Sequence, residues 1–192
     1  MPRDHFIFRK NNQLKKIDKS LKGHIDKRIE KLCDSINKTN NYYTTSSCSG
    51  RIVLLKARKE KTGDLFIRTW HDEVSFKDFK LELEKINSKE LIYFKQEPCI
   101  IHVACRKLED AQKLINLAMK AGWKRNGIIA SDKRFVAELN STEKLEFPIF
   151  KNKILFDEIY LKLIVSEANK KLNESWEKIE RIERELINTK SS

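Results

Sequence analysis

Long apolar runs are missing from this sequence of 192 residues. A membrane-spanning helix needs about 18 or more consecutive apolar residues, and no such stretch is present. The first residues also lack the apolar core of a secretory signal. We therefore expect a soluble, cytoplasmic protein that does not bind a membrane.

Paired cysteines and a glycine-rich nucleotide motif are missing as well. The four cysteines, Cys33, Cys48, Cys99 and Cys105, lie far apart without any CxxC pair, which argues against a disulfide framework and a four-cysteine zinc site. We expect reduced thiols and no metal. No G-x-G-x-x-G follows a predicted strand, so the Rossmann way of holding a nucleotide cofactor is not visible.

Positive charge is in excess. Forty Lys and Arg residues face 28 Asp and Glu, which gives a formal net charge of +12. Basic pairs and clusters recur along the chain, at residues 9–10, 15–16, 56–61 and 170–171. Such a balance favours a polyanionic partner, with nucleic acid ahead of a membrane surface, because cations contact phosphates without reading base sequence.

Helix-like and strand-like patterns alternate along the first 150 residues. Predicted helices cover residues 6–21, 25–36, 76–86 and 108–121, and predicted strands cover residues 51–58, 65–70, 91–94, 99–104, 128–130 and 135–139. Hairpin and crossover connections together predict an α/β (α+β) fold, a mixed sheet flanked by helices. We assign residues 1–150 to a single domain.

Residues 151–192 form a predicted helical extension. Apolar residues recur every three or four positions from Leu161 to Leu186, and Glu177 with Arg181 adds a favourable i,i+4 pair. A long amphipathic helix from residue 153 to 188 follows. This helix either packs along the rest of the same chain, as in a monomer, or pairs with a second chain to form a dimer. We favour the monomer, because barely four heptads are available for a coiled coil.

The ten residues from Tyr42 to Arg51 carry the most chemical information. They hold five Ser and Thr hydroxyls, one thiol, a glycine and an arginine. Ser and Thr compete for backbone hydrogen bonds and favour turns. The sequence therefore predicts a ligand-facing loop, supported by the buried strand that follows; an ordinary Ser-rich turn is the alternative.

A second group, His102-Val103-Ala104-Cys105-Arg106, lies at a predicted strand-to-helix junction. Ligands often bind at strand ends. In an extended segment His102 and Cys105 point to opposite faces, which weakens a two-ligand metal site. Cys48 with His102 leaves open a thiol nucleophile activated by an imidazole, and a serine-histidine pair is a further alternative.

Three other segments are candidates for RNA contacts. Trp70-His71 ends a predicted strand, where an aromatic face and a titratable ring suit base stacking or hydrogen bonding. Arg125-Asn126-Gly127 is a turn that could present donors to an anion, and Arg134 adds a basic corner. The alternatives are a core Trp beside a surface His for the first segment and an ordinary hairpin turn for the second.

The order of these motifs resembles one protein family. The Thr-Thr-Ser-Ser-Cys-Ser-Gly-Arg string, the His-Val-x-Cys-Arg segment, residues 108–112 and residues 122–128 resemble the wybutosine-synthesising methyltransferases, the third-step enzymes of that tRNA pathway. The resemblance covers residues 6–148. It implies S-adenosylmethionine-dependent methylation of a ring nitrogen in the tricyclic base next to the anticodon of tRNA-Phe.

The resemblance and the residue types together suggest roles for individual side chains. The catalytic candidates are His102, Ser47 and Cys48. The cofactor-binding candidates are Ser46, Ser47, Ser49, Gly50, Arg51, Cys105 and Gly127. The tRNA-binding candidates are Trp70, His71, Arg106, Arg125, Asn126 and Arg134. Two alternatives stay open: a non-catalytic RNA-binding module, and a thiol or metal hydrolase.

Overall fold

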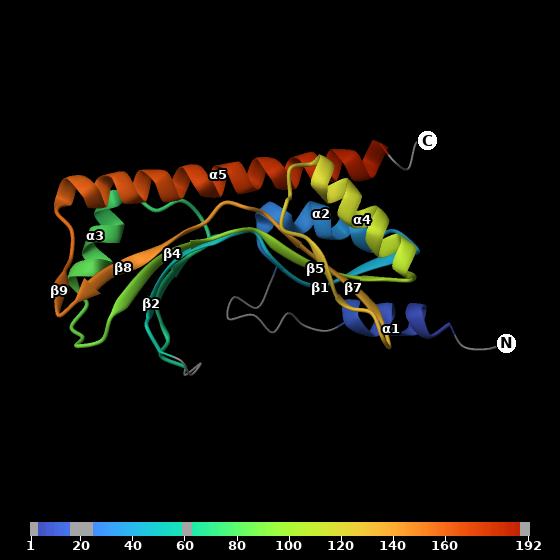
Figure 1. Cartoon of the computed structure of the whole chain (residues 1–192), viewed down its shortest axis with the longest axis horizontal. Coiled ribbons are helices and arrows are strands. Elements are labelled where there is room, and N and C mark those ends of the chain that lie inside the picture. The colour runs from blue at the N-terminus through green and yellow to red at the C-terminus, as the bar shows by residue number, and fades with distance from the viewer. Residues whose placement is uncertain (1–3, 16–24, 59–62, 189–192) are drawn as a thin grey trace. The chain divides into compact units, whose positions relative to one another are not determined.

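The computed structural model describes residues 4–15, 25–58 and 63–188 (Figure 1). Two compact units are present, and neither is continuous in the chain. Unit 1 comprises Met1–Ser49, Cys99–Thr142 and Trp176–Ser192, and unit 2 comprises Gly50–Pro98 and Glu143–Ser175. The domain boundary predicted at residue 150 falls within a strand of unit 2, β8.

Unit 1 is built on a four-stranded sheet in the order β1-β5-β7-β6. Its strands are β1 (Tyr42–Cys48), β5 (Ile100–Cys105), β6 (Gly127–Ala130) and β7 (Phe135–Asn140), and its helices include α1 (His5–Leu14), α2 (Lys27–Asn37) and α4 (Leu108–Lys120). All three strand pairings are antiparallel. In Figure 1, α1 lies below this sheet, and α2 and α4 lie above it.

Helix packing gives the two faces of this sheet different characters. The buried stripe of α2, Ile29, Leu32, Cys33 and Ile36, has no exposed surface. On the other face, the Phe6 ring of α1 packs on Tyr43 of β1, with ring centroids 5.2 Å apart. Helices α1 and α2 therefore pack on opposite faces of this sheet.

Unit 2 contains a five-stranded sheet in the order β3-β2-β4-β8-β9. Its strands are β2 (Arg51–Lys56), β3 (Phe66–Trp70), β4 (Ile92–Glu97), β8 (Leu145–Lys151) and β9 (Lys153–Ile154), with α3 (Phe76–Glu84) packed against the sheet. Phe79 of α3 contacts Phe94 edge-on, with centroids 5.6 Å apart, and Phe94 stacks on Phe147 at 5.3 Å. Aromatic packing thus holds α3 on this sheet.

The long C-terminal helix, α5 (Glu158–Asn188), contributes to both units. Its buried side chains recur at helical spacing: Leu161, Ile164, Val165, Ala168, Leu172, Trp176, Ile179, Ile182 and Leu186. The stripe that the sequence predicts is therefore buried within the chain. Among the described residues, no helix is both long and apolar enough to cross a membrane.

The predicted α+β class with flanking helices is confirmed, and two of its details change. In place of one mixed sheet there are two sheets, and every pairing between described strands is antiparallel. The predicted loop at residues 42–51 is wrong, because residues 42–48 form strand β1. Tyr and Thr favour strands, and pairing with β5 outweighs the turn preference of Ser.

Element bounds also shift at several ends. The first helix ends at Leu14, and the rest of the predicted segment lies largely outside the described residues. The C-terminal helix begins at Glu158 because residues 153–154 form the short strand β9. Helix α4 has its C-cap at Ala121, and the next residue, Gly122, has φ +92°, a conformation that glycine adopts without steric cost.

Candidate active site

Three polar side chains form a continuous row across β1, β5 and β7. Ser46 is directly opposite His102, which in turn is directly opposite Glu138. The Ser46 hydroxyl oxygen lies 2.9 Å from Nδ1 of His102. Nε2 of the same ring lies 2.8 Å from Oε2 of Glu138. The row is therefore a hydrogen-bonded chain from a serine through an imidazole to a carboxylate.

A bulge in β1 makes this row possible. Tyr43 is opposite Ala104, and Ser46 is opposite His102. Two residues lie between Tyr43 and Ser46, whereas only one lies between their partners. The register shift between residues 44 and 46 inserts the extra residue. A bulge re-aims the side chains that follow it, so Ser46 shares the α1-bearing face with Tyr43 and His102.

The chemistry of the row depends on which of its atoms donate hydrogen bonds and which accept them. An ionised carboxylate accepts hydrogen bonds only, so Glu138 accepts from Nε2–H of a neutral His102. Nδ1 is then the acceptor for the Ser46 hydroxyl. The imidazole and the carboxylate side chains are 29% and 32% exposed, so solutes reach the row. In its neutral form this imidazole can take up a proton at Nδ1 through the Ser46 hydroxyl and so serve as a general base.

Two of the predicted residues lie on the opposite, helix-covered face. Ser47 is opposite Ile101, and its hydroxyl forms a hydrogen bond with the thiol of Cys33 in α2. Cys105 is buried, and its thiol donates to the carbonyl oxygen of Val103 at 3.6 Å. The structure therefore does not bring Ser47 or Cys105 to the His102 face.

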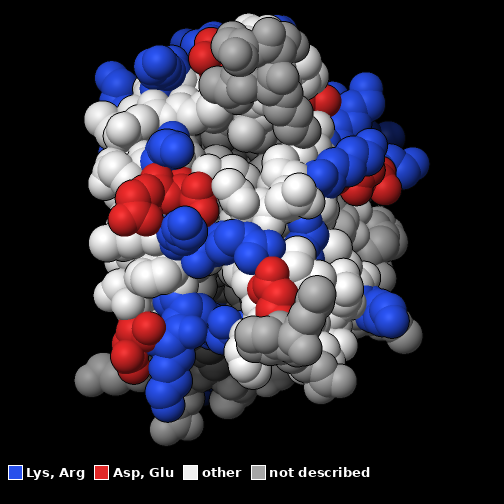
Figure 2. Space-filling model, turned by 90° about the vertical axis from the view of Figure 1, so that its right-hand side faces the viewer, with Lys and Arg blue, Asp and Glu red and all other residues white. Residues whose placement is uncertain are grey.

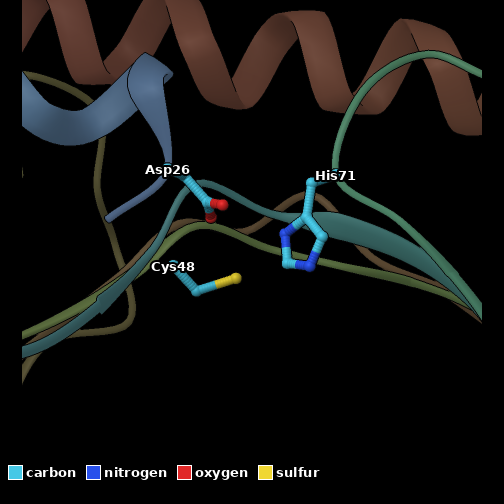
Figure 3. Close-up of side chains that lie close together, drawn as sticks. All are labelled: Asp26, Cys48 and His71. Atoms are coloured by element: carbon cyan, nitrogen blue, oxygen red, sulfur yellow. The ribbon is translucent and has the colours of Figure 1, made fainter. Parts of the chain in front are cut away.

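Cys48 and Ser49 lie at the end of β1, near the N-terminus of α2. The Cys48 sulfur lies within 4.8 Å of an Asp26 carboxylate oxygen, and Figure 3 shows the two side chains one above the other. The carboxylate of Asp26 accepts from both the backbone N–H and the hydroxyl of Ser49, each at 3.1 Å. The Ser49 carbonyl accepts from Nε1–H of Trp176 at 3.1 Å. These bonds give Ser49 a structural role at the strand end.

The cysteines should differ sharply in reactivity. Burial raises the pKa of the Cys33 thiol to about 11 and that of the Cys105 thiol to about 12. Alkylation requires the thiolate, so both should resist iodoacetamide in the folded protein at pH 8. We expect the half-exposed Cys48 to be modified first, as peptide mass spectrometry would show. Labelling of Cys105 before Cys48 would contradict this assignment.

Four of the predicted residues belong to unit 2. Gly50, with φ +94°, begins that unit and precedes Arg51. The Arg51 Nε donates to Glu97 at 2.6 Å, and its guanidinium lies 5.0 Å from the ring centroid of Phe66. Trp70 and His71 are also in unit 2, at the end of β3.

The turn before β6 is tied into unit 1. Asn126 donates its amide to the Trp123 carbonyl at 2.6 Å and accepts from the backbone N–H of Asn140 at 3.1 Å. Arg125 donates its backbone N–H to the Asn140 carbonyl. Gly127 is opposite Glu138, and a Cβ added at Gly127 would meet nothing within 4 Å. Open space therefore adjoins the carboxylate end of the row.

Glu138 is the residue that the sequence reasoning missed. Glu138 lies in a predicted strand, between the apolar residues Val136, Ala137 and Leu139. A carboxylate in such an apolar strand is a sequence signal for a candidate site residue. Only the register of β7 against β5 places it opposite His102, and register is not visible in a single sequence.

Comparison with known proteins defines the class of this enzyme. The family described as Methyltransferase TYW3 matches residues 8–188, which includes most of the C-terminal extension. A protein of Thermococcus sibiricus named tRNA(Phe) 7-((3-amino-3-carboxypropyl)-4-demethylwyosine(37)-N(4))-methyltransferase is 36% identical over 189 residues, covering 95% of this chain and 94% of the relative. The Danio rerio tRNA wybutosine-synthesizing protein 3 homolog is 36% identical, covering 94% of this chain and 74% of that protein.

A solved structure shares the fold. The PH1069 protein from Pyrococcus horikoshii superposes with a TM-score of 0.86 and 34% sequence identity, covering 96% of this chain and 94% of that one. The protein is therefore a methyltransferase. It belongs to the TYW3 methyltransferase family, as the sequence resemblance implies.

Proposed function

We propose that this protein transfers a methyl group from S-adenosylmethionine to a ring nitrogen, N4, of the tricyclic wybutosine precursor beside the anticodon of tRNA-Phe. The names of the relatives supply the acceptor, and the family supplies methyl transfer. The single observation that carries the mechanism is the Ser46–His102–Glu138 row, in which a carboxylate holds one imidazole nitrogen and leaves the other for proton transfer.

The row has a defined task in this reaction. When bound, S-adenosylmethionine supplies an electrophilic methyl group on a sulfonium. Methylation would leave the acceptor nitrogen with one proton to lose, and this proton is what the row would take up. The exposed Ser46 hydroxyl accepts that proton while its own proton passes to Nδ1 of His102. Glu138 stabilises the imidazolium that results.

The residues near the row differ in how well they suit the cofactor. Ser46 offers an exposed hydroxyl, and open space at Gly127 leaves room for a bound group beside Glu138. We assign cofactor contacts first to these two. The side chains of Ser49 and Arg51 already bond to carboxylates, and roles for them, Ser47, Gly50 and Cys105 stay predictions.

Mass spectrometry of tRNA-Phe tests the function. Cells lacking this protein should accumulate a tricyclic precursor that is one methyl group lighter, and the wild-type gene should restore the mass. Purified protein should incorporate labelled methyl from S-adenosylmethionine into that isolated tRNA. A fully modified base in the deleted strain would exclude the proposal. Salt-sensitive RNA binding without methyl incorporation would favour a non-catalytic RNA-binding module.

A further inference from the structure

Five cationic side chains gather where α1 meets the ends of β5 and β7; we call this group the α1 patch. Its members are Arg9, Lys10, Arg106, Lys133 and Arg134. Arg9 donates Nη1–H to the Lys133 carbonyl at 3.2 Å, and Lys10 donates to the Thr39 carbonyl. These carbonyls orient the side chains without neutralising their charge.

Counter-charges are scarce in this patch. Among the described residues, Arg106 is the member of the patch that forms an ion pair, with Asp4 at 2.7 Å. Lys10 is buried, and this burial, with a smaller contribution from the Arg106 charge, lowers the pKa of its ammonium. The Arg106 guanidinium is also held over the Phe6 ring, 4.8 Å from its centroid. Contacts with neighbouring groups therefore hold the cationic side chains of Arg9, Lys10 and Arg106 in place.

The patch shares a sheet face with the candidate active site. Side chains two residues apart on a strand point to the same face. His102 and Ala104 therefore share this face on β5, and Glu138 and Val136 share it on β7. Arg106 and Arg134 lie just beyond the ends of these strands, and Arg106 packs over Phe6 of α1 on the same face. Arg106 and Arg134 are each four residues along the chain from His102 and Glu138, a span of roughly 13 Å in extended backbone.

We propose that the α1 patch binds phosphates of the RNA strand that flanks the nucleotide undergoing methylation. This inference rests on the proposed function for its substrate, and it adds the surface on which that substrate lies. Arginines suit phosphate oxygens because the guanidinium offers several N–H donors in a fixed plane, and Arg9 is already oriented by the Lys133 carbonyl. Figure 2 shows the side of the molecule that bears α1 and α4, where Lys and Arg cover more surface than Asp and Glu.

A pair of charge-matched double variants tests the surface. Arg9→Gln with Arg134→Gln removes two exposed charges from the patch. Lys113→Gln with Lys120→Gln removes two from α4, which packs on the opposite face of the same sheet. Binding to tRNA-Phe and to an oligouridine is measured over a salt series, and circular dichroism melting checks that each variant is folded.

The patch variant should weaken binding to both RNAs and reduce the slope of log K against log salt by about 1.4, since each single-strand phosphate contact contributes about 0.7. The α4 variant should keep the wild-type slope. Equal slopes in the wild type and the patch variant, or equal losses in the two variants, would overturn the proposal. Failure of the proposed function has a different signature: no methyl incorporation into tRNA, with the loss of oligouridine binding still confined to the patch variant.

Discussion

Replacing His102 by Asn should lower turnover of modified tRNA by about 10²- to 10⁴-fold, the range that a positioned general base contributes. Asn keeps a polar side chain of similar reach and cannot take up the proton that the acceptor nitrogen releases. Binding of the tRNA should change little, because cations on the α1 patch contact its phosphates. Single-turnover methyl transfer, measured with labelled donor and saturating enzyme, separates chemistry from binding.

Variants of the neighbouring residues sharpen this test. Ser46→Ala and Glu138→Gln should each slow methyl transfer, and combining either with His102→Asn should add little because the three act as a unit. In Glu138→Gln the amide can donate to Nε2, which favours the wrong tautomer; ¹⁵N NMR of the imidazole would show the proton move from Nε2 to Nδ1. If the tautomer of His102 is unchanged in this variant, Glu138 does not position the proton of the imidazole.

His71→Asn is the matched control for the base assignment. His71 is the other histidine for which the sequence suggests a role, and it belongs to unit 2, whereas His102 belongs to unit 1. At saturating tRNA we expect turnover to fall far less in this variant than in His102→Asn, because a tRNA-binding role for His71 would lower affinity and not the rate of methyl transfer. If His71→Asn abolishes turnover and His102→Asn leaves it intact, the Ser46–His102–Glu138 row is not the catalytic base.

Periodicity in the sequence predicts the helices of this fold well. The apolar stripe of α4 and the glycine after it locate both the buried face and the end of that helix, because a helix packed on one side needs apolar residues at 3.6-residue spacing. The strands β2 and β3 are likewise predicted, and they pair as antiparallel neighbours. These features depend on residues close in sequence.

The candidate site depends on pairing between distant strands, and this part is not predicted. A segment rich in Ser and Thr reads as a loop until β5 satisfies its backbone hydrogen bonds. The bulge in β1 then decides that Ser46, rather than Ser47, shares a face with His102. Glu138 joins the row only through the β5–β7 register. A shift of one residue would turn each of these side chains to the other face.

Trp123→Ala should cost unit 1 about 3–5 kcal/mol of unfolding free energy, the range for removing a buried aromatic side chain. Trp123 has no exposed surface, and its indole Nε1–H donates to the Lys178 carbonyl at 3.0 Å. The substitution leaves a cavity and removes this link between the end of α4 and the C-terminal part of α5. Because single domains are typically stable by about 5–15 kcal/mol, the loss is a large fraction of the total.

Urea unfolding followed by circular dichroism measures the loss, with the slope m showing whether the unfolding transition itself has changed. Trp123→Phe separates the two contributions: it keeps most of the ring volume and loses the indole donor, so it should cost less than Trp123→Ala. Met119→Ala is the control from the same helix, because that side chain is 56% exposed and should change stability by no more than about 0.5 kcal/mol. Equal losses for Trp123→Ala and Met119→Ala would mean that the indole does not anchor α5 to unit 1.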